Sequence, residues 1–434
     1  MRQMLLATVL LGALVAGCAP KDGQPPSSDK TGPVTVFTGG TIYTGNADQP
    51  VIDAVAVGSD GRIVAMVPPT SADWGDEDVT IVDLDGSVMF PGFTDSHAHL
   101  LGIGQRELTL NLEGTASIDE LVTRTEIEVW EKEPGEILFG RGWIETGWPE
   151  GRMPSAADLD QVSPDNPVIY VRADGHALVA NTAALKAADV YDLNEDPTGG
   201  RVERGDDGKA TGIVIDYAMA PVLELLSAPS EDDISLALKT GAQTYVSRGW
   251  TGVHNMSVGR IEAPIMADLD KEGRLPLRIY NAFDESAFDV AKSRRHETGT
   301  ITNRAVKLYM DGALGSRGAL LIEPYSDRPD TSGLELLDTN ALHNLMMDAA
   351  EDDVQLAIHA IGDLANRHIL ETFSALGYGP EKRWRIEHAQ ILAPDDVAQV
   401  GALGLIASMQ PSHAIGDLKF APDRLGVDRL AGAY

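Results

Sequence analysis

The chain has 434 residues, and 43% of them are hydrophobic. It is therefore too long for one minimal domain and long enough for an α/β barrel with additional segments. Asp and Glu number 66 against 34 Lys and Arg, which gives a net charge of −32. A surface with this charge repels phosphate backbones, so we expect no nucleic-acid partner.

The amino terminus has the pattern of an export signal. Arg2 is followed by an apolar run over residues 4–15 that is too short to span a bilayer. The run ends in Leu14-Val15-Ala16-Gly17-Cys18, which resembles the lipobox of bacterial lipoproteins. The resemblance implies cleavage before Cys18 and attachment of lipid to its thiol. The alternatives are an uncleaved signal anchor and a chance cysteine after an ordinary signal.

We therefore expect a signal peptide at residues 1–17 and a linker at residues 18–32, where Pro, Ser, Gly and charged residues predominate. No later segment has an apolar run long enough to span a bilayer, so the lipid would be the only membrane contact. The mature protein would be anchored in the cell envelope and face the periplasm, with the outer membrane as the expected location.

Residues 33–89 predict the amino-terminal part of a small β-sandwich. Runs rich in β-forming residues lie at 34–37, 54–57 and 63–67, and the turn Ser59-Asp60-Gly61-Arg62 separates the last two. We expect these runs to pair as an antiparallel sheet.

From residue 90 on, short apolar strands alternate with helical stretches, as in parallel β/α units. Seven strands are predicted, at residues 88–95, 252–256, 277–282, 305–310, 354–359, 383–388 and 405–410. This series predicts a (β/α)8 TIM-type barrel over residues 90–434 that lacks strand eight. The gap after strand one is too long for a single crossover and contains further β-rich runs. We therefore expect an insert over about residues 101–245.

Histidines follow several of these strands, at the end of a barrel where catalytic groups gather. His97 and His99 are two residues apart, so on an extended chain their imidazoles point to the same side and can chelate one metal ion. His359 and His388 end two later strands. Each alone is also compatible with an ordinary hydrogen-bonded histidine, but together the four suit zinc or a similar transition metal.

Lys307 lies within the apolar strand predicted at 305–310. A lysine in such a place must lose its charge or find an anion, unless it points outward and reaches solvent between helices. A neutral lysine can react with carbon dioxide, and the resulting carbamate can bridge two cations. The residues alone leave both alternatives open.

Several segments in a fixed order are similar to one enzyme family. Pro91-Gly92-Phe93-Thr94-Asp95-Ser96-His97-Ala98-His99-Leu100 resembles the opening metal motif of the amidohydrolase superfamily. Residues 168–176, 306–317, 358–363 and 385–390 resemble the amidohydrolase 3 group, also called YtcJ-like, which includes N-substituted formamide deformylases. The resemblance extends from about residue 34 to residue 434, and the order of the motifs makes it specific.

The resemblance implies a role for each of these residues. It implies a divalent metal, expected to be zinc and present as one or two ions. The implied ligands are His97, His99, Lys307, His359 and His388, and Lys307 would be carboxylated. It implies that Lys307, His359 and His388 take part in catalysis. For the substrate it implies contacts from His176 in the insert, and a pocket shaped by Asp311, Ser316 and Arg317.

One motif of the family is not found. The resemblance implies an aspartate at the end of strand eight that binds metal and transfers protons. Asp417, Asp423 and Asp428 lie in the loop and helix after strand seven, and none fits that role. We therefore expect a family member truncated before strand eight, with little activity as it stands.

The resemblance implies metal-assisted hydrolysis of a C–N bond other than a peptide bond, in a small amide, formamide or cyclic amide. Two alternatives remain open. One is a lipid-anchored barrel that has lost catalysis and acts as a binding protein. The other is a hydrolase or isomerase of the same superfamily that acts on another bond. The sequence indicates no oligomeric state.

If Cys18 carries the lipid, its replacement should release the protein from the membrane. We expect the wild-type chain to stay with membranes through a high-salt wash and the Cys18→Ala chain to become soluble. Fractionation followed by immunoblotting measures this. A Cys18→Ala chain that remains with washed membranes would show that another feature anchors it.

Overall fold

The computed structural model describes residues 33–67 and 79–433, and the chain divides between Pro91 and Gly92 into two compact units. The predicted signal peptide, Cys18 and the linker at 18–32 lie outside the described residues. Of the helices in the described part of the chain, none is both long and apolar enough to cross a membrane.

The first unit contains two small sheets with mixed strand directions. One has the order β5-β4-β1-β6 and the other β3-β2-β7. The strands are β1 (Val34–Thr38), β2 (Thr41–Tyr43), β3 (Val51–Ile52), β4 (Ala54–Gly58), β5 (Ile63–Val67), β6 (Val79–Asp83) and β7 (Val88–Met89). The expected antiparallel pairing holds for β1, β4 and β5, but β1 pairs with β6, and β2 with β7, in parallel. The three predicted runs therefore pair as expected, and the sheets are mixed because β6 and β7 return from more distant segments rather than through hairpins.

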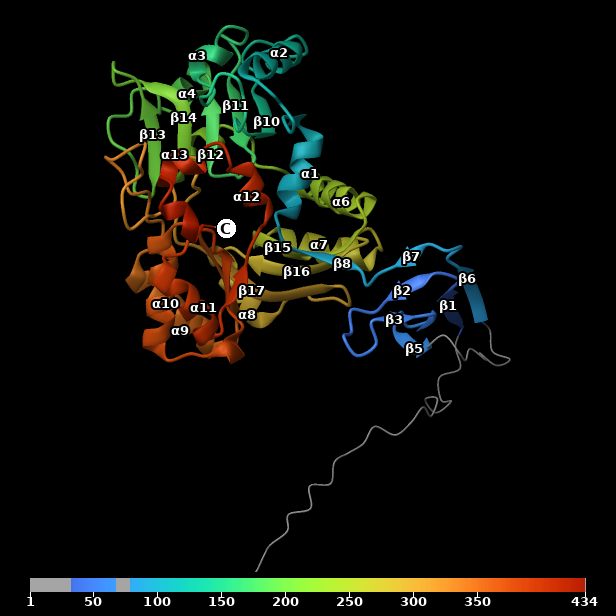
Figure 1. Cartoon of the computed structure of the whole chain (residues 1–434). Coiled ribbons are helices and arrows are strands. Elements are labelled where there is room, and N and C mark those ends of the chain that lie inside the picture. The colour runs from blue at the N-terminus through green and yellow to red at the C-terminus, as the bar shows by residue number, and fades with distance from the viewer. Residues whose placement is uncertain (1–32, 68–78, 434) are drawn as a thin grey trace, which may run out of the picture. The chain divides into compact units, whose positions relative to one another are not determined.

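The second unit is organised around a parallel sheet of seven strands in the order β20-β19-β18-β17-β16-β15-β8, as in a TIM-type barrel (Figure 1). The strands are β8 (Phe93–Ala98), β15 (Trp250–Val258), β16 (Arg278–Phe283), β17 (Ile301–Tyr309), β18 (Gln355–Ala360), β19 (Arg385–His388) and β20 (Ile406–Ser408). The strand predicted at 88–95 was misplaced, because Pro91 and Gly92 separate β7 of the first unit from β8. Within residues 33–67 and 79–433, β8 and β20 are the two edges of this sheet.

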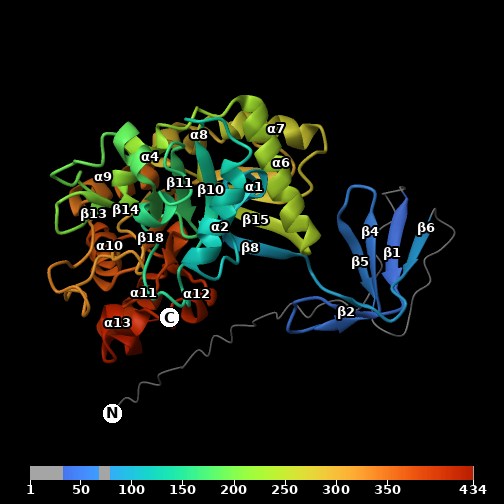
Figure 2. The ribbon, with the colours of Figure 1, turned by 90° about the horizontal axis from the view of Figure 1, so that it is seen from above.

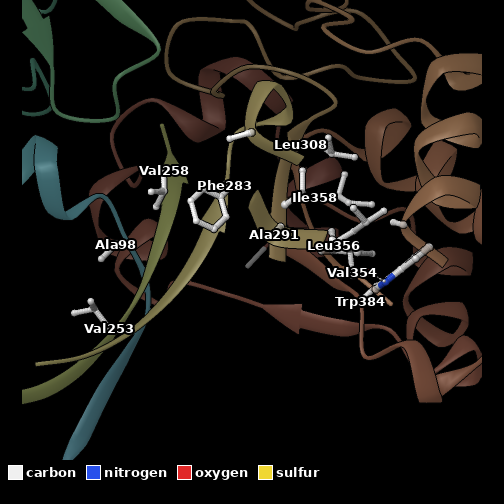
Figure 3. Packing of buried hydrophobic residues seen from close by; sticks show 14 of the residues in the cluster. Ala98, Val253, Val258, Phe283, Ala291, Leu308, Val354, Leu356, Ile358 and Trp384 are labelled. Atoms are coloured by element: carbon white, nitrogen blue, oxygen red, sulfur yellow. Dashed lines mark hydrogen bonds between the residues drawn. The ribbon is translucent and has the colours of Figure 1, made fainter. Parts of the chain in front are cut away.

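The core lies between the outer face of the barrel strands and the helices around them. Val253, Phe283, Leu308, Ile358 and Trp384 are buried in one cluster (Figure 3). The surrounding helices are α6 (Glu231–Ser247), α7 (Glu262–Lys271), α8 (Phe288–Ser293), α9 (Thr339–Glu351), α10 (Asp363–Leu376) and α11 (Pro394–Leu403), and α12 (Ser412–Gly416) and α13 (Ala421–Leu425) follow β20. Since side chains alternate across a strand, the residues between these apolar ones point into the barrel.

Between β8 and β15 the chain forms a second sheet, the insert sheet, with the order β13-β14-β12-β11-β10-β9 (Figures 1 and 2). Its strands are β9 (Leu110–Asn111), β10 (Leu138–Trp143), β11 (Val168–Arg172), β12 (Ala177–Ala180), β13 (Gly200–Arg204) and β14 (Ala210–Asp216). The helices of this region are α1 (Leu100–Leu108), α2 (Ile118–Val129), α3 (Ala156–Leu159), α4 (Thr182–Ala187) and α5 (Ala220–Leu223).

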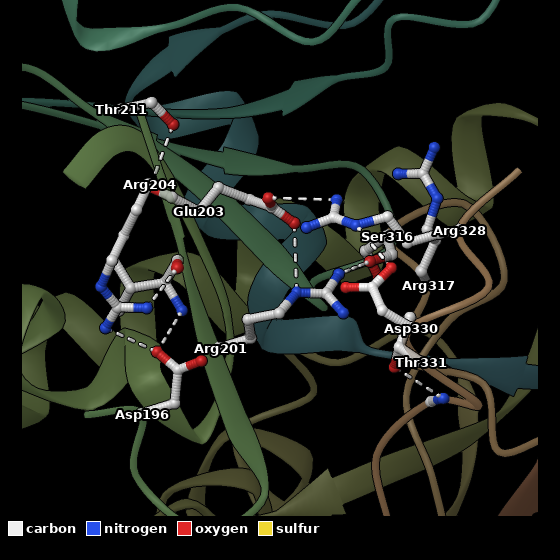
Figure 4. A network of polar contacts seen from close by, with 12 residues as sticks. Asp196, Arg201, Glu203, Arg204, Thr211, Ser316, Arg317, Arg328, Asp330 and Thr331 are labelled. Carbon is white, nitrogen blue, oxygen red and sulfur yellow. Dashed lines mark hydrogen bonds and ion pairs between the residues drawn. The ribbon is translucent and has the colours of Figure 1, made fainter. Parts of the chain in front are cut away.

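The insert sheet is tied to the long loop after β17 by polar contacts (Figure 4). Arg201 donates to the carbonyl of Ser316 at 2.7 Å, and Glu203 pairs with Arg328 at 3.5 Å. These contacts hold the insert against the carboxyl ends of the barrel strands, where the predicted site residues lie.

Inside the barrel, the guanidinium of Arg385 connects both edges of the seven-stranded sheet. It donates to the carbonyl of Ser96 on β8 at 2.7 Å and to the hydroxyl of Ser408 on β20 at 2.8 Å. It also forms an ion pair with Glu387, whose side chain is fully buried. A buried ion pair is tolerable only when its remaining donors are satisfied, and these contacts supply that.

We expect Arg385→Met to lower the free energy of unfolding of the barrel by about 3–5 kcal/mol, because it leaves the buried Glu387 carboxylate without its cation. Urea unfolding followed by tryptophan fluorescence, to which the buried Trp384 contributes, measures this. The matched control is Arg274→Met, which removes an exposed pair with Glu272 and should change stability far less. Equal losses in the two variants would show that Arg385 does not hold the barrel together.

Candidate metal-dependent active site

The register of the barrel strands brings the predicted site residues together. Tyr309 on β17 is level with His359 on β18, which is level with Glu387 on β19. Neighbours at the same level of a parallel sheet point to the same face, so these three side chains enter the barrel in one layer. Lys307 lies one layer below, level with Ala357 and Arg385.

Four imidazoles form a contiguous cluster at this end of the barrel. The ring centroids of His97 lie 5.4 Å from His99 and 4.7 Å from His388, and His359 lies 4.6 Å from His388. The ring of His176 reaches down from the insert to within 4.9 Å of His359. Residues from distant segments of the chain therefore meet at one place.

The backbone at the end of β19 is strained where it joins this cluster. His388 has φ 72° and Ala389 has φ 43°, in the left-handed region that residues with a side chain rarely adopt. In a regular strand Glu387 and His388 would point to opposite faces. The left-handed turn allows both to approach His97: Glu387 Oε2 is 2.6 Å from His97 Nδ1, and the rings of His388 and His97 are 4.7 Å apart. Strain of this kind is concentrated at functional sites.

Hydrogen bonds fix which nitrogen each imidazole can offer to a ligand. His97 is bound through Nδ1 by Glu387, and His388 Nδ1 lies 2.7 Å from the side-chain oxygen of Gln410, so Nε2 remains on both rings. His359 is turned the other way. Its Nε2 is 3.3 Å from Asp311 Oδ1 and 3.4 Å from the carbonyl of Gly312, while its Nδ1 is buried without a partner.

The charge states at the site suit metal ligands. Burial lowers the pKa of His97, His359 and His388, which favours the neutral imidazole that binds metal. Burial acts to raise the pKa of Glu387, but hydrogen bonds from His97 and Arg385 hold it at about 2. The carboxylate is therefore ionised, and it orients the His97 ring by accepting a hydrogen bond from Nδ1.

Lys307 points into the barrel rather than outward between the helices. Its side chain is 2% exposed, and Nζ lies 4.4 Å from the centre of the Tyr309 ring. Burial lowers the pKa of this amine to about 7. The burial of the side chain removes the alternative of a solvated surface lysine, and the lowered pKa favours the neutral amine.

The three residues expected to shape the pocket occupy the loop after β17. Asp311 is buried and accepts backbone N–H groups from Leu320, Ile361 and Gly362. Burial raises the pKa of Asp311 to about 7, although these bonds act in the opposite direction. Its contact with His359 makes it a group that orients an imidazole.

Ser316 and Arg317 make their side-chain contacts within or near the same loop. The hydroxyl of Ser316 donates to the carbonyl of Ala313 at 3.3 Å, and Arg317 pairs with Asp327 at 2.8 Å. The structure thus brings His176 and Asp311 to the imidazole cluster, whereas the side-chain contacts of Ser316 and Arg317 stabilise the loop.

The donor set fits a metal ion only in part. In the described part of the chain, no three His, Cys, Asp or Glu side chains are already arranged to hold one ion together. The cluster nevertheless contains a buried His359 Nδ1 that lacks a partner, and neutral His97 and His388 whose Nε2 atoms remain after orientation by other groups. An unsatisfied buried nitrogen is costly, and a ligand would remove that cost. The residues therefore fit a metal that imidazoles bind.

Sequence reasoning missed Glu387, Gln410 and Asp216, which orient His97, His388 and His176 respectively. Glu387 is the residue before His388, so placing His388 in the site by strand alternation alone turns Glu387 away from it. A carboxylate inside an apolar strand was nevertheless a usable signal. Asp216 had no local signal, because it meets His176 only through the pairing of the insert strands.

Most of the chain is similar to known amidohydrolases. The model of the Amidohydrolase family matches residues 80–434. The putative amidohydrolase YtcJ of Bacillus subtilis is 31% identical over 92% of this chain and 77% of its own length. The N-substituted formamide deformylase of Arthrobacter pascens is 26% identical over 86% of this chain and 72% of its own.

Among solved structures, an uncharacterized metal-dependent hydrolase from Pyrococcus horikoshii superposes with a TM-score of 0.70 at 28% identity. The match covers 92% of this chain and 79% of that one. The family implies a hydrolase that uses a divalent metal. The family match covers most of the chain, and the imidazole cluster lies at the mouth of its barrel. The chain therefore belongs to the amidohydrolase family.

Proposed function

We propose that the protein hydrolyses C–N bonds other than peptide bonds in small amides or formamides, with zinc as its metal. The observation that carries this proposal is the set of oriented imidazoles, in which His97 and His388 present Nε2 and His359 presents a buried, unpartnered Nδ1. Imidazole ligands suit zinc. The similarity to an N-substituted formamide deformylase supports the choice of bond.

His97, His99, His359 and His388 would hold the ion. A bound zinc ion supplies Lewis acidity and an activated water for attack on a carbonyl. The chain itself fixes the donors: Glu387 and Gln410 hold two rings by Nδ1, and Asp311 holds a third by Nε2. His176 lies over the cluster from the insert, where it would contact a substrate that enters between the insert and the barrel.

We further propose that Lys307 is carboxylated in the working enzyme. The amine is buried without an ion pair in the described residues, and its low pKa makes the neutral, reactive form available. A carbamate there would bring an anionic oxygen donor to a cluster of neutral imidazoles. A barrel that only binds ligands has no need of a buried amine in this position, which argues against the binding-protein alternative.

The proposed activity predicts metal-dependent turnover by the full chain. We expect release of amine and formate from an N-substituted formamide, loss of turnover on chelation, and recovery on adding zinc. A variant with His97→Ala and His99→Ala should lose more than about 100-fold in kcat/KM, since even groups that only orient ligands account for 10–100-fold. The matched control is Asp396→Asn, a buried carboxylate that pairs with Arg367 away from the cluster.

Each other outcome has a defined meaning. Turnover that survives both chelation and the double substitution would contradict the proposal. Turnover of esters but not amides would favour a superfamily enzyme for another bond. Tight binding of amides without turnover, in the presence of zinc, would favour the binding protein.

Metal affinity tests the orienting groups separately from activity. We expect Glu387→Gln to weaken zinc binding by about 10–100-fold, because the neutral amide is a poorer acceptor for the His97 Nδ1 proton. Equilibrium dialysis measures the dissociation constant, and Asp396→Asn again serves as the control. Equal affinity in Glu387→Gln and wild type would show that His97 is not a ligand or does not depend on Glu387.

A further inference from the structure

The insert supplies a carboxylate and an imidazole as a cross-strand pair. β12 and β14 are antiparallel, with Ala177 opposite Ile215, so the next pair along the ladder is His176 opposite Asp216. The Asp216 N–H donates to the His176 carbonyl at 3.1 Å, and their side chains meet at 2.7 Å between Nδ1 and Oδ1. The register of two insert strands therefore creates this pair.

Asp216 is held in an unfavourable state. Its backbone has φ 49° and ψ −127°, a conformation that favours glycine. Its side chain is 3% exposed, and its second oxygen, Oδ2, is buried without a hydrogen-bond partner. Neither feature stabilises the fold, and strained residues with unmet polar atoms are concentrated at ligand sites.

The loop after β17 closes over this carboxylate. A Cβ atom at Gly312 would lie 2.3 Å from Asp216 Oδ2, and one at Gly318 would lie 2.7 Å from it. Only glycine allows this approach at either position. The carbonyl of Gly312 also approaches Nε2 of His359. One loop thus contacts both the carboxylate of the insert and an imidazole of the barrel.

The contact with Asp216 determines which ring nitrogen of His176 is available to a ligand. Because Nδ1 faces Asp216, the nitrogen on the opposite edge of the ring, Nε2, is the one left for a ligand. The ring lies 4.9 Å from His359 and 6.1 Å from Tyr309, so it stands over the imidazole cluster. Two different elements, a strained carboxylate and a glycine loop, fix this orientation.

We propose that Asp216 is a positioning residue for the reaction. It holds His176 by Nδ1, so that Nε2 contacts the substrate, and it acts only through that imidazole. The pair forms the insert's half of the substrate site. The kinetic test of this inference rests on the proposed function, whereas the spectroscopic test does not.

A double-mutant cycle separates this role from a structural one. We expect Asp216→Asn to lower kcat/KM for a formamide substrate about 10–100-fold and His176→Asn to lower it at least as much. The double variant should match His176→Asn alone, because Asp216 has no route to the reaction except His176. Losses that multiply would overturn the proposal. Asp160→Asn, which removes an insert carboxylate bonded to Thr182, should leave kcat/KM unchanged.

A second variant guards against a loss that merely reflects misfolding. Asp216→Gly relieves the strained backbone and removes the unpartnered oxygen. We expect its melting temperature to be no lower than that of the wild type, with turnover reduced as in Asp216→Asn. A clearly lower melting temperature would assign Asp216 to holding the insert together and would contradict the proposal.

The tautomer of His176 can be measured without metal or substrate. In the full chain labelled with ¹⁵N-histidine, at a pH where the His176 ring is neutral and with His176→Asn used for assignment, we expect His176 to carry its proton on Nδ1. In Asp216→Gly this preference should weaken and the Nε2-protonated form should grow. The same tautomer in both proteins would overturn the positioning role, even if no amide substrate has been found.

Discussion

The ion pair of Arg385 and Glu387 is the interaction on which the interior of the barrel depends. Two charges removed from water are stable only when their donors and acceptors are all used. Here the guanidinium reaches Ser96 on one edge strand and Ser408 on the other, while the carboxylate also accepts from His97. The same pair therefore connects the edges of the sheet and orients the first imidazole of the site. Stability and chemistry share one set of contacts.

Around this pair the site is built against local conformational preference. The left-handed backbone at His388 lets that residue and Glu387 both approach His97, and Asp216 is strained where the insert approaches from above. Lys307 is buried as an amine, and His359 keeps a nitrogen without a partner. The apolar packing between strands and helices must stabilise all of these at once. Backbone strain and unpaired buried polar groups that occur together in one place are typical of a ligand site.

Sequence reasoning located the barrel strands because their apolar runs carry a local signal. It predicted His97 and His359 near strand ends, where they lie in β8 and β18, for the same reason. It failed where local signals compete: the apolar Val88–Met89 pair appeared continuous with Phe93, but Pro91-Gly92 separates two units. His176 was predicted as a site residue only from the resemblance to a family, because hydrophobic periodicity does not single out a histidine in a loop.

Other parts of the site depend on long-range geometry that no single segment encodes. Neither His nor Ala favours a positive φ, so the turn at His388 and Ala389 that brings His388 to the same site as Glu387 was not predictable. Asp216 reaches His176 through strand pairing across 40 positions. For Lys307 the sequence left two orientations open, and the burial of Val306 and Leu308 among the core residues decides between them.

The central claim is that these oriented imidazoles bind a metal ion. X-ray absorption spectroscopy of the zinc-loaded full chain tests it most directly. The account predicts nitrogen donors at about 2.0–2.1 Å with the outer-shell scattering of imidazole rings, and loss of that scattering in a His97→Ala, His359→Ala variant. A spectrum without imidazole scattering, or one unchanged in that variant, would contradict the account.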